Sequence, residues 1–142
     1  MIDQESLTIL LVDDDDVSQE AVIRSFKQNS INFPIVTADD GQEALEILRN
    51  VHTTKHIDGP LIVLLDLNMP RMNGFEFLQA IRSDPTLATT VVFVLTTSST
   101  DSDRTRAYEE FIAGYMVKSA AGPQFGKLAN LLVNYGQTVS LP

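Results

Sequence analysis

Five short apolar runs, each followed by an amphipathic stretch, most constrain the fold of this chain. The apolar runs indicate buried strands at residues 8–12, 35–38, 61–65, 91–95 and 114–117. The stretches after them have the period of helices that bury one side, at residues 17–29, 41–51, 75–82, 101–112 and 123–135. Strand then helix, repeated five times, predicts an α/β fold with a parallel sheet covered on both faces. Right-handed crossovers leave few topologies, and we expect a flavodoxin-like, doubly wound (βα)5 sheet with strand order 2-1-3-4-5.

The helical spacing also predicts which side chains face the sheet. In the first two helices the inward residues are expected to be Val17, Ala21, Val22, Phe26, Ala44, Leu45, Leu48 and Val51. In the later helices they are expected to be Phe75, Phe77, Leu78, Ile81, Phe125, Leu128, Leu132 and Tyr135. The charged residues of the fourth helix, Arg106 among them, are expected to form a solvated face.

Length and composition narrow the class of protein. A chain of 142 residues suits one domain, and we assign residues 1–135 to it and residues 136–142 to a tail, with no output domain. A net charge of −9 disfavours binding to nucleic acid or an anionic membrane. The absence of cysteine excludes disulfides and thiolate chemistry, and no apolar run reaches membrane-spanning length. We therefore expect a cytoplasmic protein.

Polar residues stand directly after the predicted strands. An acid run, residues 13–16, follows the first strand and Asp66 follows the third, while Thr96 ends the fourth and Lys118 follows the fifth. In an open parallel sheet the carboxyl ends of the strands share one edge, and ligands bind there. The sequence therefore predicts one site that combines acids, a hydroxyl and an amine.

The charges of this site indicate a chemistry. Asp13, Asp14 and Asp66 carry three negative charges, which one Mg²⁺ and the ammonium of Lys118 would neutralise. Hard oxygen ligands favour Mg²⁺ over softer metals. A free carboxylate is also a competent nucleophile toward phosphorus. These residues therefore favour a carboxylate that takes up a phosphoryl group. Asp15 and Asp16 are better explained as acids at the N-terminus of the following helix.

Four segments, taken together, resemble the receiver domain of two-component response regulators, the CheY-like superfamily. They are Leu11 to Asp14, Leu65 to Pro70 with Asn73-Gly74, Leu95 to Thr97, and Tyr115 to Lys118. The match extends over residues 7–133 with the motifs in order. The resemblance implies that Asp66 is the phosphoacceptor and that a sensor histidine kinase or phosphotransfer protein is the donor. It also implies no enzymatic activity beyond the protein's own phosphorylation and dephosphorylation.

The resemblance assigns roles to the other site residues. Asp14 and Asp66 would ligate Mg²⁺, with the backbone carbonyl of Asn68 as a third protein ligand, and Asp13 would act through a metal-bound water. Lys118 would contact the phosphoryl group.

Two further residues would form the switch. Thr96 would turn toward the phosphoryl group and Tyr115 would move inward behind it. That motion would alter the face formed by the fourth helix, fifth strand and fifth helix, where partners, or a second copy in a homodimer, would bind.

One residue departs from the family pattern. The family usually has proline after the lysine, whereas this chain has Ser119. A cis bond before a non-proline residue costs about 3 kcal/mol, which favours a trans Lys118–Ser119 peptide without deciding between the two forms, and we still expect Lys118 to serve at the site.

Two alternative functions remain open from the sequence. A phosphatase of the haloacid dehalogenase type uses the same residue types, but its nucleophile follows the first strand and its acid/base is an aspartate two residues later, where this chain has Asn68. The other alternative is a receiver-like scaffold that is not phosphorylated. Within the receiver family, residues 95–99 and the single-domain layout are similar to regulators that pair with phytochrome-like kinases.

Overall fold

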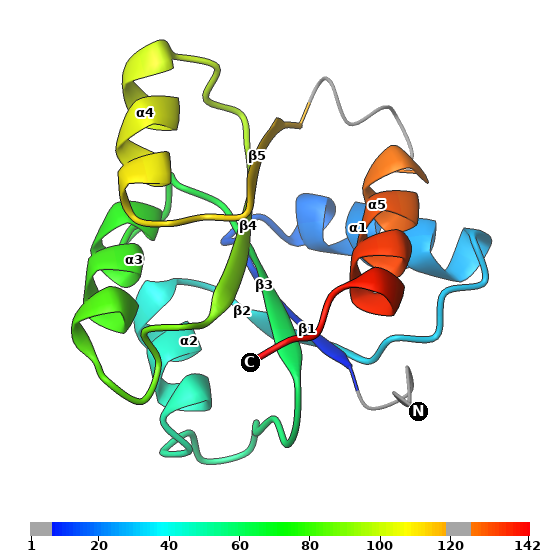
Figure 1. Ribbon diagram of the computed structural model, residues 1–142, viewed down its shortest axis with the longest axis horizontal. Helices are drawn as coiled ribbons and strands as arrows, with labels where there is room; N and C mark the ends of the chain where they lie inside the picture. Colours follow the sequence, from blue (N-terminus) through cyan, green and yellow to red (C-terminus); the bar gives the residue numbers. More distant parts are fainter. Residues whose placement is uncertain (1–6, 119–125) are drawn as a thin grey trace.

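The computed structural model describes residues 7–118 and 126–142, and its five strands form one parallel sheet (Figure 1). The strands are β1 (Thr8–Val12), β2 (Ile35–Ala38), β3 (Leu61–Leu65), β4 (Val91–Thr96) and β5 (Gly114–Val117). Their order is β2-β1-β3-β4-β5, and every neighbouring pair is parallel. The predicted doubly wound α/β fold and its strand order are thus confirmed.

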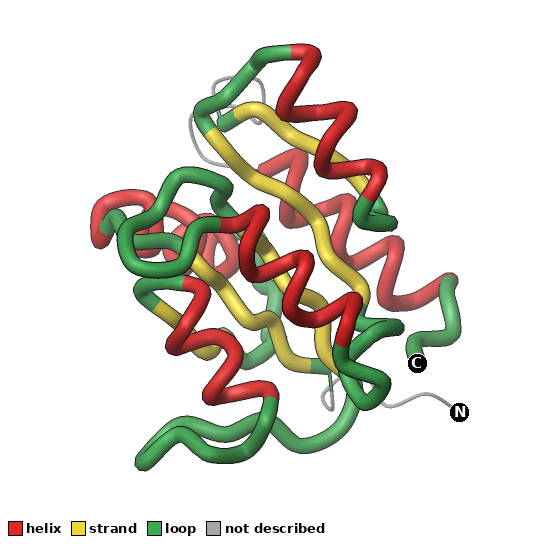
Figure 2. Tube along the Cα trace, turned by 90° about the vertical axis from the view of Figure 1, so that its left-hand side faces the viewer, coloured by secondary structure: helices red, strands yellow, loops and turns green. Residues whose placement is uncertain are grey.

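Five helices cover the two faces of the sheet. They are α1 (Asp16–Gln28), α2 (Gly41–Leu48), α3 (Gly74–Ser83), α4 (Asp101–Glu109) and α5 (Gly126–Thr138). Helices α1 and α5 lie on one face and α2, α3 and α4 on the other, as Figure 1 shows. Figure 2 shows the strands running between these helical layers.

Each face of the sheet has its own apolar core, because alternate side chains of a strand point to opposite faces. Leu10 and Val12 of β1 face the α2–α3–α4 layer, where Phe77 and Ile81 are fully buried. The α1–α5 layer packs on the other face through a second cluster, which includes Ile9, Leu11, Phe26, Leu128 and Leu132. The three central strands β1, β3 and β4 are buried on both faces, which explains their continuous apolar runs, whereas the edge strands β2 and β5 are mostly half-buried.

Two residues predicted to face the sheet are exposed. Val17 is 77% exposed: it lies in the first turn of α1, beside the acid run, and belongs to neither core cluster. Val51 is 67% exposed because α2 ends at Leu48 and Asn50 takes a left-handed conformation (φ 59°) that turns the chain out of the helix. Phe125, predicted to be a core residue, lies outside the described residues.

Helix α5 extends past the boundary expected from the sequence. It continues to Thr138, and the N–H of Val139 donates a hydrogen bond to the carbonyl of Tyr135 at 3.0 Å. Leu141 packs against the core cluster of the α1–α5 layer. Residues 136–142 therefore begin within the last helix and pack on the domain.

Helix α4 has a much smaller apolar interface than the other helices of its layer. Ala107 is its only buried residue, and polar contacts hold both its ends. At the N-terminus, Thr100 caps the helix by accepting from the N–H of Asp103 at 3.2 Å. In the middle, the guanidinium of Arg106 lies 4.0 Å from the ring centroid of Phe75 in α3, so Arg106 is not merely part of a solvated face.

The C-terminal end of α4 is fastened by one side chain of α3. Arg82 donates hydrogen bonds of 2.7 to 3.1 Å to four backbone carbonyls. Those of Ala88 and Thr90 lie in the segment before β4, and those of Glu110 and Phe111 lie directly after α4. Phe111 itself has a left-handed backbone (φ 60°) and a side chain that is 79% exposed. The end of α4 is therefore held by hydrogen bonds to its backbone rather than by burial of Phe111.

No helix within residues 7–118 or 126–142 is long and apolar enough to cross a membrane.

Candidate phosphoryl-acceptor and metal site

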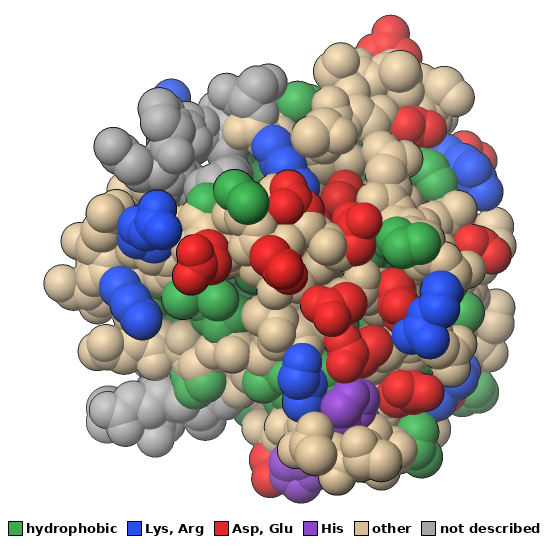
Figure 3. Space-filling model, turned by 180° about the vertical axis from the view of Figure 1, so that it is seen from behind, with side chains coloured by type: hydrophobic (Ala, Val, Ile, Leu, Met, Phe, Trp, Pro, Cys, Tyr) green, Lys and Arg blue, Asp and Glu red, His purple; other side chains and the backbone are tan. Residues whose placement is uncertain are grey.

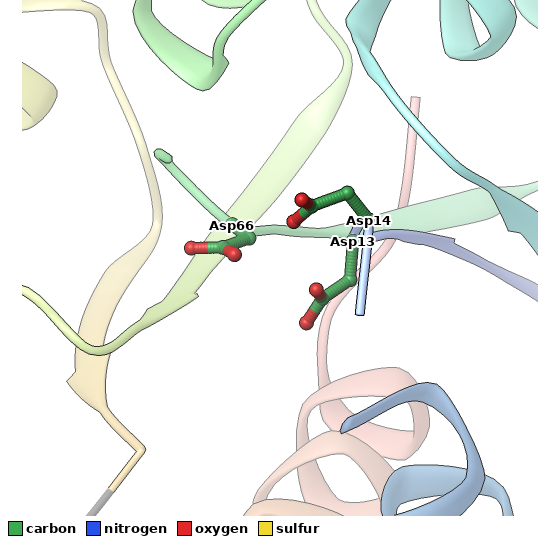
Figure 4. A group of neighbouring side chains, drawn as sticks. All are labelled: Asp13, Asp14 and Asp66. Atoms are coloured by element: carbon green, nitrogen blue, oxygen red, sulfur yellow. The ribbon is translucent and has the colours of Figure 1, made fainter. Parts of the chain in front are cut away.

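Three carboxylates converge at the carboxyl edge of the sheet. Asp13 and Asp14 follow β1, and Asp66 follows the adjacent strand β3. The N–H of Asp66 donates a hydrogen bond to the carbonyl of Val12 at 2.9 Å, which continues the pairing of β1 with β3 beyond the strand end. One oxygen of each carboxylate lies within 4.8 Å of one oxygen of each of the others. Figure 4 shows the three side chains close to one another at this edge of the sheet. Asp13 and Asp66 are buried and Asp14 is exposed, so the group is reachable from one side.

Lys118 brings a positive charge to this group from β5. Its Nζ lies 2.8 Å from Oδ2 of Asp13 and 3.6 Å from Oδ2 of Asp66. The backbone N–H of Lys118 donates to the carbonyl of Thr96 at 2.8 Å, which continues the pairing of β5 with β4 beyond the strand end. The sheet thus places the ammonium among the carboxylates.

Burial and charge act against each other at this ion pair. Burial raises the pKa of Asp13, and the hydrogen bond from Lys118 offsets only part of that rise. Burial alone would lower the pKa of Lys118, but the hydrogen bond to Asp13 and the charges of Asp13 and Asp66 outweigh it, so the pKa of Lys118 is raised. The ammonium therefore stays charged at neutral pH.

The hydroxyl of Thr96 already faces the proposed acceptor. The side chain is fully buried, and its Oγ1 donates a hydrogen bond to Oδ1 of Asp66 at 3.0 Å. The N–H of Ser98, two residues later, lies 3.4 Å from the same Oγ1. Thr96 therefore links the carboxylate to the loop between β4 and α4.

Tyr115 contacts the same loop from β5. Its ring is half-buried against the core of the α2–α3–α4 layer, and its hydroxyl donates to the carbonyl of Ser98 at 3.0 Å. The hydroxyl of Ser98 in turn donates to Oδ2 of Asp103 at 2.6 Å. Ser98 thus joins the site residue Thr96, the strand β5 and the first turn of α4.

The loop after β3 is closed tightly behind Asp66. The N–H of Gly74, the first residue of α3, donates to the carbonyl of Leu67 at 3.0 Å. A Cβ at Gly74 would lie only 2.6 Å from the carbonyl oxygen of Asp66, so a side chain there would force the backbone apart. Asn68, inside this loop, directs its N–H toward Oδ1 of Asp66 at 3.4 Å.

Two residues of α1 belong to the site although no sequence pattern indicates them. The side-chain amide of Gln19 donates to the backbone carbonyl of Asp13 and, at 3.2 Å, to Oδ1 of Asp39. The hydroxyl of Ser18 lies 3.2 Å from Nζ of Lys118. These contacts join segments up to 100 residues apart, and a serine or glutamine in a first helical turn carries no signal for such partners.

Acidic side chains gather on the face shown in Figure 3, with basic and histidine side chains among them. Asp40 caps α2 and pairs with Arg71 at 2.7 Å, which joins the loops after β2 and β3. His52, in the loop after α2, is mostly buried: its Nε2 lies 3.0 Å from Oε2 of Glu43, and its Nδ1 accepts from the N–H of Lys55 at 3.0 Å. The Lys118–Ser119 peptide lies outside the described residues.

A doubly wound sheet with this acid group, threonine and lysine at its edge has the layout of a signalling receiver. The model of the family "Response regulator receiver domain" matches residues 9–129, and the chain belongs to this family. Family membership does not favour the phosphatase alternative.

The chain is similar to several proteins along most of its length. It is 35% identical over 115 residues to the probable methanogenesis regulatory protein FilR2 of Methanothrix harundinacea, covering 81% of this chain and 74% of FilR2. It is 31% identical to the response regulator Rcp1 of Synechocystis over 135 residues, covering 94% of this chain and 92% of Rcp1.

Two solved structures have the same fold. The Mn(2+)-bound form of Rcp1 superposes with a TM-score of 0.81 at 31% identity, covering 95% of this chain and 98% of that chain. The phosphorylated cyanobacterial phytochrome response regulator RcpA superposes with a TM-score of 0.80 at 30% identity, covering 95% and 97%. The predicted likeness to phytochrome-associated regulators is thereby confirmed.

Proposed function

We propose that Asp66 of this two-component receiver accepts a phosphoryl group from a phosphohistidine on a sensor histidine kinase or phosphotransfer protein. The observation that carries the proposal is the placement of the Asp66 carboxylate, buried at a strand end, 3.6 Å from the ammonium of Lys118 and beside two further acids. The protein would then pass the signal on by protein–protein contact.

The transfer needs a nucleophile and positive charge around the moving group. A carboxylate oxygen of Asp66 forms the new O–P bond while the N–P bond of the phosphohistidine breaks, and the imidazole keeps the electron pair and is protonated. Lys118 faces Asp66 and would neutralise charge on the phosphoryl oxygens, which is most of what phosphoryl transfer requires of a protein. Thr96 would donate its hydrogen bond to the phosphoryl group instead of to the free carboxylate.

The acid group suits a divalent cation. The three carboxylates carry three negative charges and Lys118 carries one positive charge, so one divalent cation would neutralise the site. One oxygen of each carboxylate already lies within 4.8 Å of the others. Carboxylate ligands favour Mg²⁺, and the related Rcp1 has been described in an Mn(2+)-bound form. Asp14, Asp66 and the carbonyl of Asn68 would hold the ion directly and Asp13 through water. The cation would supply charge neutralisation at the phosphoryl oxygens.

The described contacts offer a route by which phosphorylation would reach the surface. Thr96 contacts Asp66, and Ser98 connects Thr96 with Tyr115 and with Asp103 of α4. If Thr96 donated its hydrogen bond to the phosphoryl group instead of the free carboxylate, the conformation of this loop would change. The α4–β5–α5 face would change with it.

Partners and location follow from the same proposal. The likeness to Rcp1 and RcpA favours a histidine kinase of the phytochrome type as donor. A second copy binding at the α4–β5–α5 face would give a homodimer. The net charge of −9 disfavours nucleic acid and anionic membranes as partners, and we propose a cytoplasmic location. No turnover of another substrate is proposed.

Uptake of phosphate from acetyl phosphate, measured by intact-protein mass spectrometry with and without Mg²⁺, tests the proposal. Asp66→Asn is the control, because it keeps the shape of the side chain and removes the nucleophile. Mg²⁺-dependent uptake by the wild-type protein and none by the variant is the expected result. Uptake by Asp66→Asn at the wild-type rate would show that another residue is the acceptor. Failure of folded wild-type protein to take up phosphate from either acetyl phosphate or a kinase would favour the unphosphorylated scaffold.

A further inference from the structure

The ammonium of Lys118 is held by a residue of α1 as well as by the acids of the sheet edge. Nζ lies 2.8 Å from Oδ2 of Asp13 and 3.2 Å from Oγ of Ser18, while Oδ2 of Asp66 is farther away at 3.6 Å. An ammonium has three N–H donors and no acceptor. Asp13 and Ser18 therefore take two donors, and one remains for a group bound at Asp66.

Ser18 is itself oriented to accept from the lysine. Its hydroxyl donates to Oδ2 of Asp15 at 3.1 Å, and Asp15 is fixed as the N-cap of α1 by accepting from the N–H of Val17 at 3.0 Å. A hydroxyl has one hydrogen and two lone pairs, so with its hydrogen given to Asp15 it can only accept from Lys118.

These contacts close into a ring. The N–H of Asp15 donates to Oδ1 of Asp13 at 2.9 Å, and Oδ2 of Asp13 accepts from Lys118. The ring thus runs from Asp13 through Asp15, Ser18 and Lys118 back to Asp13. The pKa of Asp15 is lowered, first by the hydrogen bond from the N–H of Val17, which lies outside the ring, and then by the hydrogen bond from Ser18 within it.

We propose that Ser18 is a positioning residue that holds the ammonium of Lys118 beside Asp66 during phosphoryl transfer. The inference rests on the proposed function and extends it to a residue outside the acid group. Asp13 would be shared between Lys118 and a cation bound at that group, and the cation would weaken its hold on the ammonium through charge repulsion. Ser18 is a neutral partner on a separate element, so a cation bound at the acid group would not repel the ammonium from it.

The position of Ser18 separates this role from a structural one. The side chain is only partly buried, and it lies in the first turn of a helix that already has an N-cap. Its replacement by alanine opens no apolar cavity, so the midpoint of urea unfolding should stay close to that of the wild type. An effect of that replacement should therefore be found in the transfer rate.

The test compares Ser18→Ala with Ser18→Thr, which keeps the hydroxyl, and with Ser102→Ala, the same change in the first turn of α4. For each protein we would measure the rate of phosphoryl uptake from acetyl phosphate at saturating Mg²⁺, the Mg²⁺ dissociation constant by calorimetry, and the ¹⁵N resonance of the Lys118 ammonium. That resonance is sharp only when hydrogen bonds restrain the group.

Ser18→Ala should lower the uptake rate about tenfold, the lower end of what one hydrogen bond to a charged group contributes. Its Lys118 resonance should broaden while the Mg²⁺ dissociation constant changes less than about twofold, because no carboxylate is altered. Ser18→Thr should restore the rate and the resonance, and Ser102→Ala should match the wild type.

Two results would overturn the inference alone: wild-type uptake by Ser18→Ala, or a loss of rate in Ser18→Ala that Ser18→Thr does not restore. Absence of uptake by the wild-type protein itself would overturn the proposed function and the inference together, so the two failures are distinguishable.

Discussion

Helices α3 and α4 are neighbours in one layer, but different interactions hold them in place. Helix α3 buries an apolar stripe that includes Phe75, Phe77 and Ile81. Helix α4 buries only Ala107 and is held at its ends by hydrogen bonds to Ser98 and Arg82. Burial of a large apolar side chain stabilises by about 1.5–3 kcal/mol, whereas one hydrogen bond contributes about 1 kcal/mol net. We therefore expect α4 to change position at a lower cost in free energy than α3.

The difference also separates the site from its support. Helix α3 begins at Gly74, which approaches the backbone of Asp66 closely, so this helix is packed against the proposed acceptor. The contacts of α4 pass through Ser98, which touches Thr96, so this helix is linked to Asp66 by hydrogen bonds. Under the proposed function, α3 would hold the acceptor in place and α4 would respond to its phosphorylation.

Phe77→Ala should have the largest effect, because it removes a fully buried ring from the stripe of α3. We expect the free energy of unfolding, measured in urea, to fall by about 3–5 kcal/mol. Phe77→Leu, which keeps most of the apolar volume, should cost clearly less. A loss below about 1 kcal/mol for the alanine variant would show that burial of apolar side chains is not the main interaction that stabilises α3.

Arg82→Ala should have the next largest effect, because four backbone carbonyls lose a charged donor. We expect a loss of about 2–3 kcal/mol. Hydrogen exchange should accelerate more at the C-terminal end of α4 than anywhere in α3. Arg82→Lys keeps the charge but offers fewer directed donors, so its stability should lie between those of the wild type and Arg82→Ala. Equal acceleration in both helices would contradict the proposed difference between them.

Ser98→Ala should loosen the other end of α4 by a smaller amount. Loss of the hydrogen bond to Asp103 should cost about 0.5–1.5 kcal/mol and speed the exchange of amides in the first turn of α4, with α3 unaffected. Ser99→Ala, an exposed neighbour, is the matched control. If both serine variants gave the same exchange pattern, Ser98 would not be the link between the site and α4.

The smallest effect concerns the ion pair of Asp40 with Arg71, on the α2–α3 side. Burial opposes ionisation of Asp40, but the hydrogen bonds from Arg71 and from the N–H of Glu43 outweigh it and lower the pKa of Asp40. A lowered folded-state pKa contributes stability above the unfolded-state pKa, and that stability is lost as the pH falls through the folded-state value. Because Arg71 is mostly exposed, we expect a loss below about 1 kcal/mol between about pH 5 and pH 3.

Urea titrations of the wild type and Arg71→Gln would measure this term. The variant should lose less stability than the wild type over that pH range, since its Asp40 no longer has the guanidinium beside it. Identical pH profiles would mean that the pair contributes nothing measurable.

The fold could be predicted from the sequence because strands buried on both faces require continuous apolar runs. Four of the five strands have the predicted bounds, and β4 extends one residue further, to Thr96. The ends of helices are harder to predict than the strands. Val51 lies outside α2 because Asn50 takes a left-handed conformation, which leaves no apolar pattern in the sequence. The prediction that Val17 faces the sheet is wrong. The helical period identifies which side of a helix is apolar, but it does not indicate how far along the helix the sheet extends.

The candidate site was predictable to the extent that strand ends deliver its residues. Asp13, Asp66, Thr96 and Lys118 meet because the sheet order brings their strands together. Ser18 and Gln19 could not be found in this way, since their partners depend on how α1 is rotated against the sheet. That rotation is set by packing of the whole α1–α5 layer, which no local pattern encodes.

The contact of Gly74 with the backbone of Asp66 bears on how such a protein could diversify. The hydrogen bond from Gly74 to Leu67 closes the loop at its base, so the residues between them form a segment with pinned ends. Insertions into such a loop add little closure entropy. The loop around Asp66 could therefore be lengthened or altered in sequence, which would change the surface offered to a partner, while Asp66 itself stays in place.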